Sequence, residues 1–290
     1  MGDAMITAIA TGLLVLVGLA QVVILIGQRR QLRLDLAESY RRRWTECRKD
    51  WAGLVFIGRA SGEFYQVGDR ETVKMLERAV EQYDGRSRDA WVSDSVRSVT
   101  SMLSDISLRI LQGQLHVSDV YPIFGTELLR HSRALRVLLD VEYMHSGYGL
   151  CDDPDHVCKH DYLRGHVQEW LIYHDGIRRR CLILIDLLWA EASRLEDLPP
   201  PELKSAADAK KLSGKDSRSR LFSEFRRLNG VTAFRRGLQL RSFLRHAEYR
   251  QKLSKTGIDP KRLAMLEAKW LDRLLHKQRL TFSGAGKYGR

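Results

Sequence analysis

The sequence has 290 residues, and its 48 Lys and Arg against 36 Asp and Glu give a net charge of +12 at pH 7. This length suits one folded domain plus a smaller module. No Gly-x-Ser-x-Gly, phosphate-binding glycine loop, dinucleotide fingerprint or His-Glu-x-x-His motif occurs. Nucleophilic and acid–base catalysis therefore find little support in the sequence, and we name no catalytic residue from it.

The N-terminal stretch of residues 4–28 is apolar: 25 consecutive residues carry no charge, and Arg29 and Arg30 close the stretch. As a helix it is about 37 Å long, enough to cross the roughly 30 Å hydrocarbon core of a bilayer. A secretory signal peptide would begin with a basic segment, whereas only Asp3 precedes this stretch. An N-myristoylation motif needs Ser or Thr at position 6, where this chain has Ile. A buried core helix is the remaining alternative, and we expect a retained membrane anchor because soluble cores seldom contain runs of this length.

The flanking charges predict how the anchor is oriented. Nothing basic precedes it, and eight Lys and Arg follow between residues 29 and 49. The positive-inside rule therefore puts the N-terminus outside and the rest of the chain in the cytoplasm, with a single span in the inner (plasma) membrane. In that reducing compartment the four cysteines are expected as thiols or metal ligands. Ala8 and Gly12 have a small-xxx-small spacing, a candidate contact for a homo-oligomer.

An amphipathic helix is expected directly after the anchor. We interpret Trp44 and Trp51 as part of its core-facing stripe; the alternative is that they anchor the chain at headgroup depth. The opposite face carries Arg41, Arg42 and Arg43, which suit anionic lipid or serve as a topology signal on a solvated face. The apolar stripe recurs at steps of three and four residues and comprises Leu36, Tyr40, Trp44, Cys47, Trp51, Leu54 and Val55.

Helical periodicity continues beyond this helix, and period-2 runs bounded by turn residues are scarce. Ser118 and Asp119 are the expected N-cap of one later helix. The predicted fold class is all-α, with an N-terminal single transmembrane helix, a cytoplasmic helical bundle up to residue 197 and a basic C-terminal helical module. Within the bundle we expect helices over residues 69–83, 93–111, 120–143 and 161–196.

One segment of the predicted bundle, residues 103–139, resembles a known family. The features that carry the resemblance are Ile106-Ser107-Leu108-Arg109-Ile110, Gly113, Ser118-Asp119 and Phe124-Gly125. On these features the segment resembles a bacterial family catalogued as domain of unknown function 4760, whose members pair a membrane-spanning N-terminus with a cytoplasmic helical domain. The chain departs from that pattern at Leu103-Ser104-Asp105-Ile106, where the family favours an Asn-Phe-Phe-Glu-like run. The resemblance implies an architecture and no activity.

Ligand-type residues are concentrated between residues 145 and 174, which hold five of the nine histidines and two of the four cysteines. Zinc prefers thiolate and imidazole ligands in a tetrahedral arrangement. The alternative is a polar, solvated loop whose cysteines are ordinary thiols. Zinc is thus the one cofactor that the sequence suggests. The candidate ligands, spaced Cys-x4-His-x-Cys-x-His with one more histidine downstream, are Cys151, His156, Cys158, His160 and His166.

The basic excess of the chain lies in its last third, because residues 198–290 hold 23 Lys and Arg against 8 Asp and Glu. After three prolines, residues 198–219 are expected to be a flexible linker, and residues 220–282 two basic amphipathic helices, the first interrupted at Gly230. A loose tail over residues 283–290 follows. Basic and aromatic residues alternate here, which suits anionic lipid or nucleic acid; the alternative is a helical hairpin whose aromatics form its core. The candidate contacts are Arg226, Arg227, Arg235, Arg236, Arg241 and Arg245.

These features predict a single-pass membrane-anchored helical interaction or scaffold protein whose basic module engages anionic lipid or a protein partner. One alternative is a membrane-tethered nucleic-acid-binding protein. A second alternative is a metal-dependent enzyme or sensor that uses the Cys151–His166 cluster. The expected partners are therefore the lipid bilayer, anionic phospholipid, nucleic acid or another protein.

Overall fold

The computed structural model describes residues 2–59, 74, 78, 85–140, 154–212, 217–230, 234–247 and 260–285. None of these residues lies in a strand, which confirms the all-α prediction. The expected helix over residues 69–83 lies almost entirely outside the described residues. The elements are α1 Gly2–Glu46, α2 Arg48–Gly58, α4 Gly85–Gln112, α5 Val117–Val120, the π-helix η1 Tyr121–Gly125, α6 Thr126–Arg130, α7 Ser132–Leu139, α9 Pro154–Tyr173, α10 Asp175–Leu195, α11 Pro200–Leu212, α12 Ser217–Asn229, α13 Phe234–Ala247 and α14 Pro260–Ala285.

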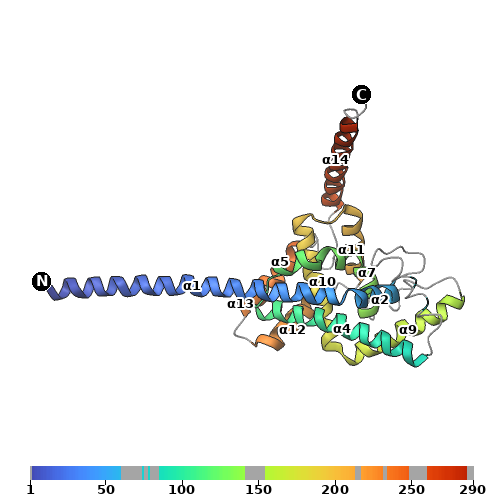
Figure 1. Ribbon diagram of the computed structural model, residues 1–290, viewed down its shortest axis with the longest axis horizontal. Coiled ribbons are helices and arrows are strands. Elements are labelled where there is room, and N and C mark those ends of the chain that lie inside the picture. The colour runs from blue at the N-terminus through green and yellow to red at the C-terminus, as the bar shows by residue number, and fades with distance from the viewer. Residues whose placement is uncertain are drawn as a thin grey trace.

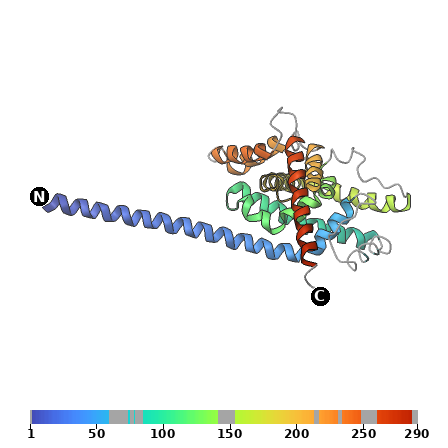
Figure 2. The same ribbon diagram turned by 90° about the horizontal axis from the view of Figure 1, so that it is seen from above.

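Helix α1 is a single helix of 45 residues that runs from the apolar N-terminal stretch to the bundle (Figure 1). Its N-terminal half stands clear of all other drawn helices in both views (Figure 2), and its large side chains, such as Leu14 and Val23, are exposed. Within the described part of the chain, one helix is long and apolar enough to cross a membrane, and it is this one. Apolar surface exposed to this extent marks a contact with a membrane or a protein.

The C-terminal half of α1 packs against the bundle. The Tyr40 hydroxyl donates a hydrogen bond of 2.5 Å to the Asp105 carboxylate on α4, and the buried Trp44 ring stacks on Phe124 with centroids 4.8 Å apart. The chain bends at Cys47, and α2 then carries Trp51 into the core. Burial of Trp44 and Trp51 confirms that both tryptophans belong to the bundle core.

Helix α10 is the central element of the bundle, and it packs against α4, α9, α11, α12 and α13. Every residue from Cys181 to Ser193 is buried, including Asp186 and Glu191. Asp186 pairs with Arg136 of α7 at 2.5 Å, and both side chains are 1% exposed. Such a pair is stable only while both charges are present, since removing either leaves an uncompensated buried ion.

The helix expected over residues 161–196 is two helices, because α9 ends at Tyr173 and α10 begins at Asp175. His174 leaves the helical conformation, with φ −110° and ψ 44°. Its ring stacks on Trp170 at 4.1 Å, and its Nδ1 lies 2.8 Å from the Trp170 carbonyl oxygen. The apolar stripe continues across this break, which is why periodicity alone predicts one helix.

Residues 117–139 also differ from the single helix expected over residues 120–143. The sequence forms α5, then the π-helix η1, then α6 and α7 with a break at His131. The predicted N-cap is wrong: α5 is capped by His116, whose backbone amide donates to the Asp119 carboxylate at 3.0 Å. Asp119 is thus the third residue of the helix, where a carboxylate satisfies an otherwise unpaired amide.

The segment expected as a flexible linker contains a helix. Three residues of α11, Leu203, Ala206 and Ala207, are buried against the bundle. The predicted division into a bundle and a separate basic module also differs from the structure, because Leu221 of α12 and Leu244 of α13 belong to the same core. Helix α14 projects from this bundle, as Figure 1 shows, and extends to Ala285.

A close approach of α2 to α7 gives a test of this packing. A Cβ atom at Gly58 would lie 2.2 Å from the carbonyl oxygen of Ala134. We predict that Gly58→Ala lowers the free energy of unfolding by about 1–3 kcal/mol, because backbone on the facing helix has to move. Thermal and urea unfolding of the detergent-solubilised protein measures the change.

The matched control is Gly165→Ala on α9, where an added methyl group meets nothing within 4 Å. That substitution should leave stability unchanged or raise it by up to about 1 kcal/mol, since alanine favours the helix over glycine. Equal stability of the two variants would show that α2 and α7 do not pack this closely.

Candidate anion-binding site

Helices α12 and α13 form a hairpin that folds back on α10. Gly230 ends α12 with φ 63°, a conformation that other residues rarely adopt. The two helices approach so closely that a Cβ atom at Gly237 would lie 2.8 Å from the Phe225 ring. Phe225 is itself buried between α12 and the core. The hairpin is therefore fixed on the bundle, and the orientation of its outer face is fixed with it.

Glu224 joins this hairpin to α10. Its carboxylate is 2% exposed, and it accepts from Arg227 at 2.6 Å and lies 3.3 Å from Arg180 and 3.6 Å from Arg179. Burial raises the pKa of Glu224. The hydrogen bond from Arg227 and the three guanidinium charges together lower it by more than burial raises it, so the pKa is below its usual value. Arg180 also donates to Ser104 of α4 at 2.7 Å, so one cation links three helices.

An open groove of about 890 Å³ lies on the outer side of the hairpin, and we call it the basic groove. Arg227 is held by Glu224, but no carboxylate of the described residues forms an ion pair with Arg226 or Arg241. The groove therefore presents cations whose charge is not compensated within the described structure. Its lining consists of Arg218, Ser219, Phe222, Ser223, Arg226, Arg227 and Arg241.

The exposed face of α13 combines apolar and cationic side chains. Phe234 is 53% exposed and Leu238 is 43% exposed, while Gly237 and Leu244 face the bundle. Arg235 is exposed beside Phe234 and has no ion-pair partner among the described residues. Large exposed apolar groups flanked by arginine are typical of helices that lie in a membrane interface.

Both views place α12 and α13 at the end of the bundle that faces the N-terminal half of α1, with α2 and α9 at the opposite end (Figures 1 and 2). On this side α1 packs against α5 and η1. Arg33 of α1 lies 4.0 Å from Asp119 of α5. Burial lowers the pKa of the neighbouring His116, and the charges of Arg33 and Arg236 lower it further, which is partly offset by Asp119.

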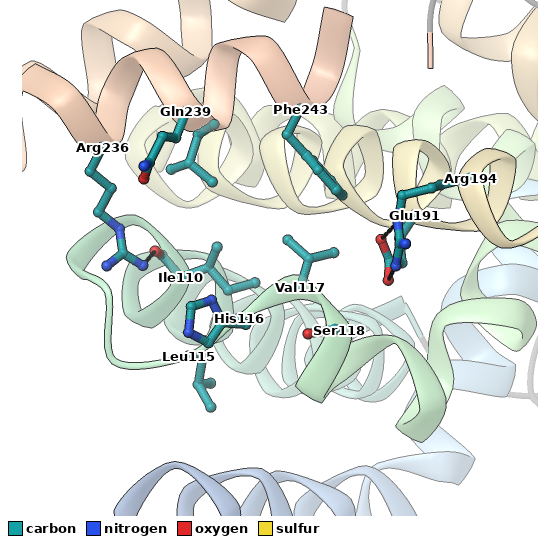
Figure 3. Close-up of a pocket in the computed structure, with 11 residues that line it drawn as sticks. Ile110, Leu115, His116, Val117, Ser118, Glu191, Arg194, Arg236, Gln239 and Phe243 are labelled. Atoms are coloured by element: carbon teal, nitrogen blue, oxygen red, sulfur yellow. Dashed lines mark hydrogen bonds and ion pairs between the residues drawn. The ribbon is translucent and has the colours of Figure 1, made fainter. Parts of the chain in front are cut away.

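A second cavity, of about 400 Å³, lies between α13, α10 and the segment that joins α4 to α5; we call it the inner pocket (Figure 3). Arg236 reaches into it from α13 and donates to the Ile110 carbonyl oxygen at 3.1 Å. Burial lowers the pKa of Arg236. At the opposite end of the pocket Glu191 accepts from Arg194 at 2.6 and 2.9 Å.

The structure separates the C-terminal arginines predicted from the sequence. Arg226, Arg227 and Arg241 share the basic groove, and Arg235 lies on the adjoining exposed face. Arg236 points inward instead, and the side chain of Arg245 lies outside the described residues. Sequence reasoning missed Arg218, which lines the same groove. The helical spacing of Arg218, Phe222 and Arg226 was a usable signal, but Arg218 fell within the expected linker.

The juxtamembrane arginines lie elsewhere, on the part of α1 that runs beside the bundle. Arg41 pairs with Glu38 at 3.3 Å, and Arg43 lies 3.8 Å from Asp105 of α4. Arg42 is exposed. Two of the three guanidinium groups thus have carboxylate neighbours.

The candidate zinc ligands lie mostly beyond what the structure describes. Cys151 is outside the described residues, and for His156, Cys158 and His160 only the helical backbone of α9 is described. In a helix, positions 156 and 160 are about one turn apart, whereas position 158 is about half a turn around the axis. His166 Nε2 lies 3.2 Å from the Ser93 hydroxyl. No group of three His, Cys, Asp or Glu suited to a metal occurs among the described residues, and the zinc site stays a prediction.

Comparison with known proteins gives no family assignment, since no family model, no curated protein and no solved structure matches this chain. The resemblance of residues 103–139 to the domain of unknown function 4760 therefore stays a prediction. The function has to be argued from α1, the basic groove and the inner pocket.

The Glu224 cluster gives a prediction on how the hairpin is held. Glu224→Gln removes a buried charge that three arginines share, so the free energy of unfolding at pH 7 should fall by about 3 kcal/mol. Because the folded pKa of Glu224 is lowered, the wild-type contribution is complete above the ordinary value of 4.5 and is lost as the pH falls through the folded pKa. Chemical unfolding of the full chain between pH 7 and pH 3 measures both effects.

Glu267→Gln on the exposed face of α14 is the control for this substitution. It also removes one carboxylate charge, but from an exposed position, and should change the free energy of unfolding by less than about 0.5 kcal/mol. A Glu224→Gln protein as stable as this control at pH 7 would contradict the role of Glu224.

Proposed function

We propose that this protein is a single-pass membrane protein whose helical bundle is held against the cytoplasmic face of the inner (plasma) membrane. There the basic groove and the exposed face of α13 bind the headgroups of anionic phospholipids. The observation that carries the proposal is that Arg226, Arg235 and Arg241, which have no ion-pair partner among the described residues, lie at the end of the bundle nearest the apolar half of α1.

The length of α1 supports this assignment. Arg33 follows the apolar stretch by five residues, which is about 7.5 Å of helix, and Arg33 contacts Asp119 of α5. This side of the bundle is therefore within about one Debye length of the headgroups. Arg41, Arg42 and Arg43 lie about 20 Å along the helix from the end of the apolar stretch. We assign lipid contact to α12 and α13 and not to those three arginines.

The composition of the exposed face of α13 also supports lipid over other anionic partners. Phe234 and Leu238 are apolar and exposed in the midst of cations. In an interface such side chains enter the acyl boundary while arginines remain at headgroup depth. Each arginine near an anionic leaflet contributes about 1 kcal/mol. Three arginines without an ion-pair partner in the described part of the chain are thus enough to keep the hairpin on the surface without a deep lipid site.

The proposed orientation follows from the charges after the span and can be tested in cells. We predict that protease added outside intact cells leaves the bundle undigested, while an epitope tag placed before residue 2 is accessible from outside, because the basic flank remains inside. Immunoblotting with a second tag after residue 290 measures protection. Digestion of the bundle in intact cells, or recovery of the full chain in the soluble fraction without detergent, would overturn the membrane proposal.

The lipid contact is tested by removing the charges of its three arginines together. In nanodiscs that contain about one third anionic phospholipid, amides of α13 should exchange with deuterium more slowly than in neutral phosphatidylcholine nanodiscs. We predict that Arg226→Gln/Arg235→Gln/Arg241→Gln abolishes this difference, because about 3 kcal/mol of surface attraction is lost. Hydrogen exchange of the full chain, read by mass spectrometry, measures it.

The matched control removes three exposed cations elsewhere, Lys49→Gln/Lys204→Gln/Arg273→Gln on α2, α11 and α14. It has the same net charge as the test variant and should keep the lipid-dependent protection. Loss of protection in both variants would mean that net charge and not the basic groove attracts the bilayer. Equal exchange in neutral and anionic nanodiscs for the wild-type protein would contradict lipid binding by α13.

Nucleic acid is the second candidate partner, because the same arginines can contact phosphates and the phenyl rings can stack on bases. The nanodisc measurement separates the two when a single-stranded oligonucleotide is added to neutral nanodiscs. Protection of α12 and α13 by the oligonucleotide, with none from anionic lipid, would replace the lipid proposal by the nucleic-acid one.

A further inference from the structure

The inner pocket has a cationic end that the lipid-contact proposal does not use. Arg236 donates one hydrogen bond, to the Ile110 carbonyl oxygen, and its Nε is shielded from solvent without a hydrogen-bond partner. No carboxylate of the described residues forms an ion pair with it. The one carboxylate in the pocket wall, that of Glu191, is held through both oxygens by Arg194. A half-buried guanidinium without a counterion is unfavourable unless an anion joins it.

The chain is shaped to keep Arg236 in this position. Gly113, at the end of α4, has φ 89°, and a Cβ atom there would lie 1.9 Å from Nη1 of Arg236. Any other residue would displace the guanidinium from the turn. Its neighbour His116 has a lowered pKa, caused first by burial and then by the charges of Arg33 and Arg236. The cationic end of the pocket is therefore built from backbone shape as well as from one side chain.

Between its charged ends the pocket wall is mainly apolar, with Ser118 and Gln239 as further polar side chains. Figure 3 shows the Phe243 ring and the Val117 side chain between the two charged ends. Leu115 and Leu240 also line the cavity. A volume of about 400 Å³ is within the range of sites that bind small molecules. A guanidinium at one end of an apolar cavity suits a ligand with one acidic group, because arginine binds carboxylate and phosphate through paired N–H groups.

We propose that the inner pocket binds one small amphiphilic anion, a carboxylate or phosphate monoester attached to an apolar group. The acidic group binds Arg236, and the apolar group lies between Phe243 and Val117. The ligand is either a membrane-derived acyl anion, since α13 is on the side of the bundle that faces the apolar half of α1, or a soluble aromatic or aliphatic acid. The proposal does not depend on lipid headgroup binding by the basic groove.

Binding is measured on the full chain in neutral phosphatidylcholine nanodiscs, so that anionic phospholipid headgroups do not contribute. Two probes are compared by hydrogen exchange of residues 110–118: oleate supplied in the bilayer and 4-phenylbutyrate supplied in water. We expect at least one of them to slow exchange in this segment in a saturable way. The neutral analogue 4-phenylbutanol should give no protection, because it has no group for Arg236.

Arg236→Gln should weaken binding of the effective probe by about tenfold or more. The matched control is Arg273→Gln, an exposed arginine of α14 outside both the basic groove and the inner pocket, which should bind as the wild-type protein does. If Arg236→Gln lowers the melting temperature, Gln239→Trp provides a second variant, because a large ring at this exposed wall position fills the cavity and leaves Arg236 intact.

Protection by oleate alone identifies a membrane-derived ligand, and protection by 4-phenylbutyrate alone identifies a soluble acid; both outcomes support the pocket. Absence of protection by either probe overturns the proposal. So does equal binding by the wild-type, Arg236→Gln and Gln239→Trp proteins. Because Arg236→Gln alters the pocket and leaves Arg226, Arg235 and Arg241 in place, failure of one proposal is distinguishable from failure of the other.

Discussion

The arrangement depends on the continuity of α1. Backbone amides and carbonyls inside a bilayer find no water, so a segment that crosses it has to satisfy them within a helix. This chain extends that helix without interruption to Glu46, where Tyr40 and Trp44 already belong to the bundle core. A continuous helix leaves little freedom between a span and the domain attached to it. In the proposed arrangement, the side of the bundle that faces the membrane is determined by the face of α1 on which α4, α5 and η1 pack.

Buried charge then fixes the orientation of the C-terminal hairpin. Helix α10 places Arg179 and Arg180 against Glu224 of α12, and these ion pairs fix the face of α12 that meets the bundle. With α12 held in this way, Gly237 brings α13 against Phe225. The same rotation leaves Arg226 and Arg241 outside and sends Arg236 inside. One core cluster thus sets the chemistry of both the basic groove and the inner pocket.

Much of the helical content could be predicted from local pattern, and the failures have physical causes. The buried stripe through Trp44 and Trp51 and the break at Gly230 follow from periodicity and from the freedom of glycine. The division at His174 does not, because both helices there continue the same apolar stripe. Helix α11 was missed because its Lys, Ala and Ser composition suits a linker as well as a helix. Burial of Leu203 against the bundle is what distinguishes the two. Arg235 is exposed and Arg236 points into the inner pocket, and this difference depends on how α13 is rotated against α4. That rotation is a tertiary property which no local signal contains.

The most direct test of this account is the depth of α13 at the bilayer. The full-length Phe234→Trp protein, reconstituted in anionic nanodiscs with brominated acyl chains, reports contact through quenching of tryptophan fluorescence. Tyr162→Trp on α9, at the opposite end of the bundle, carries the same six native tryptophans and serves as the reference. The account predicts stronger quenching in the Phe234→Trp protein than in the Tyr162→Trp protein. Equal quenching of the two proteins would show that the hairpin does not face the membrane and would contradict the central claim.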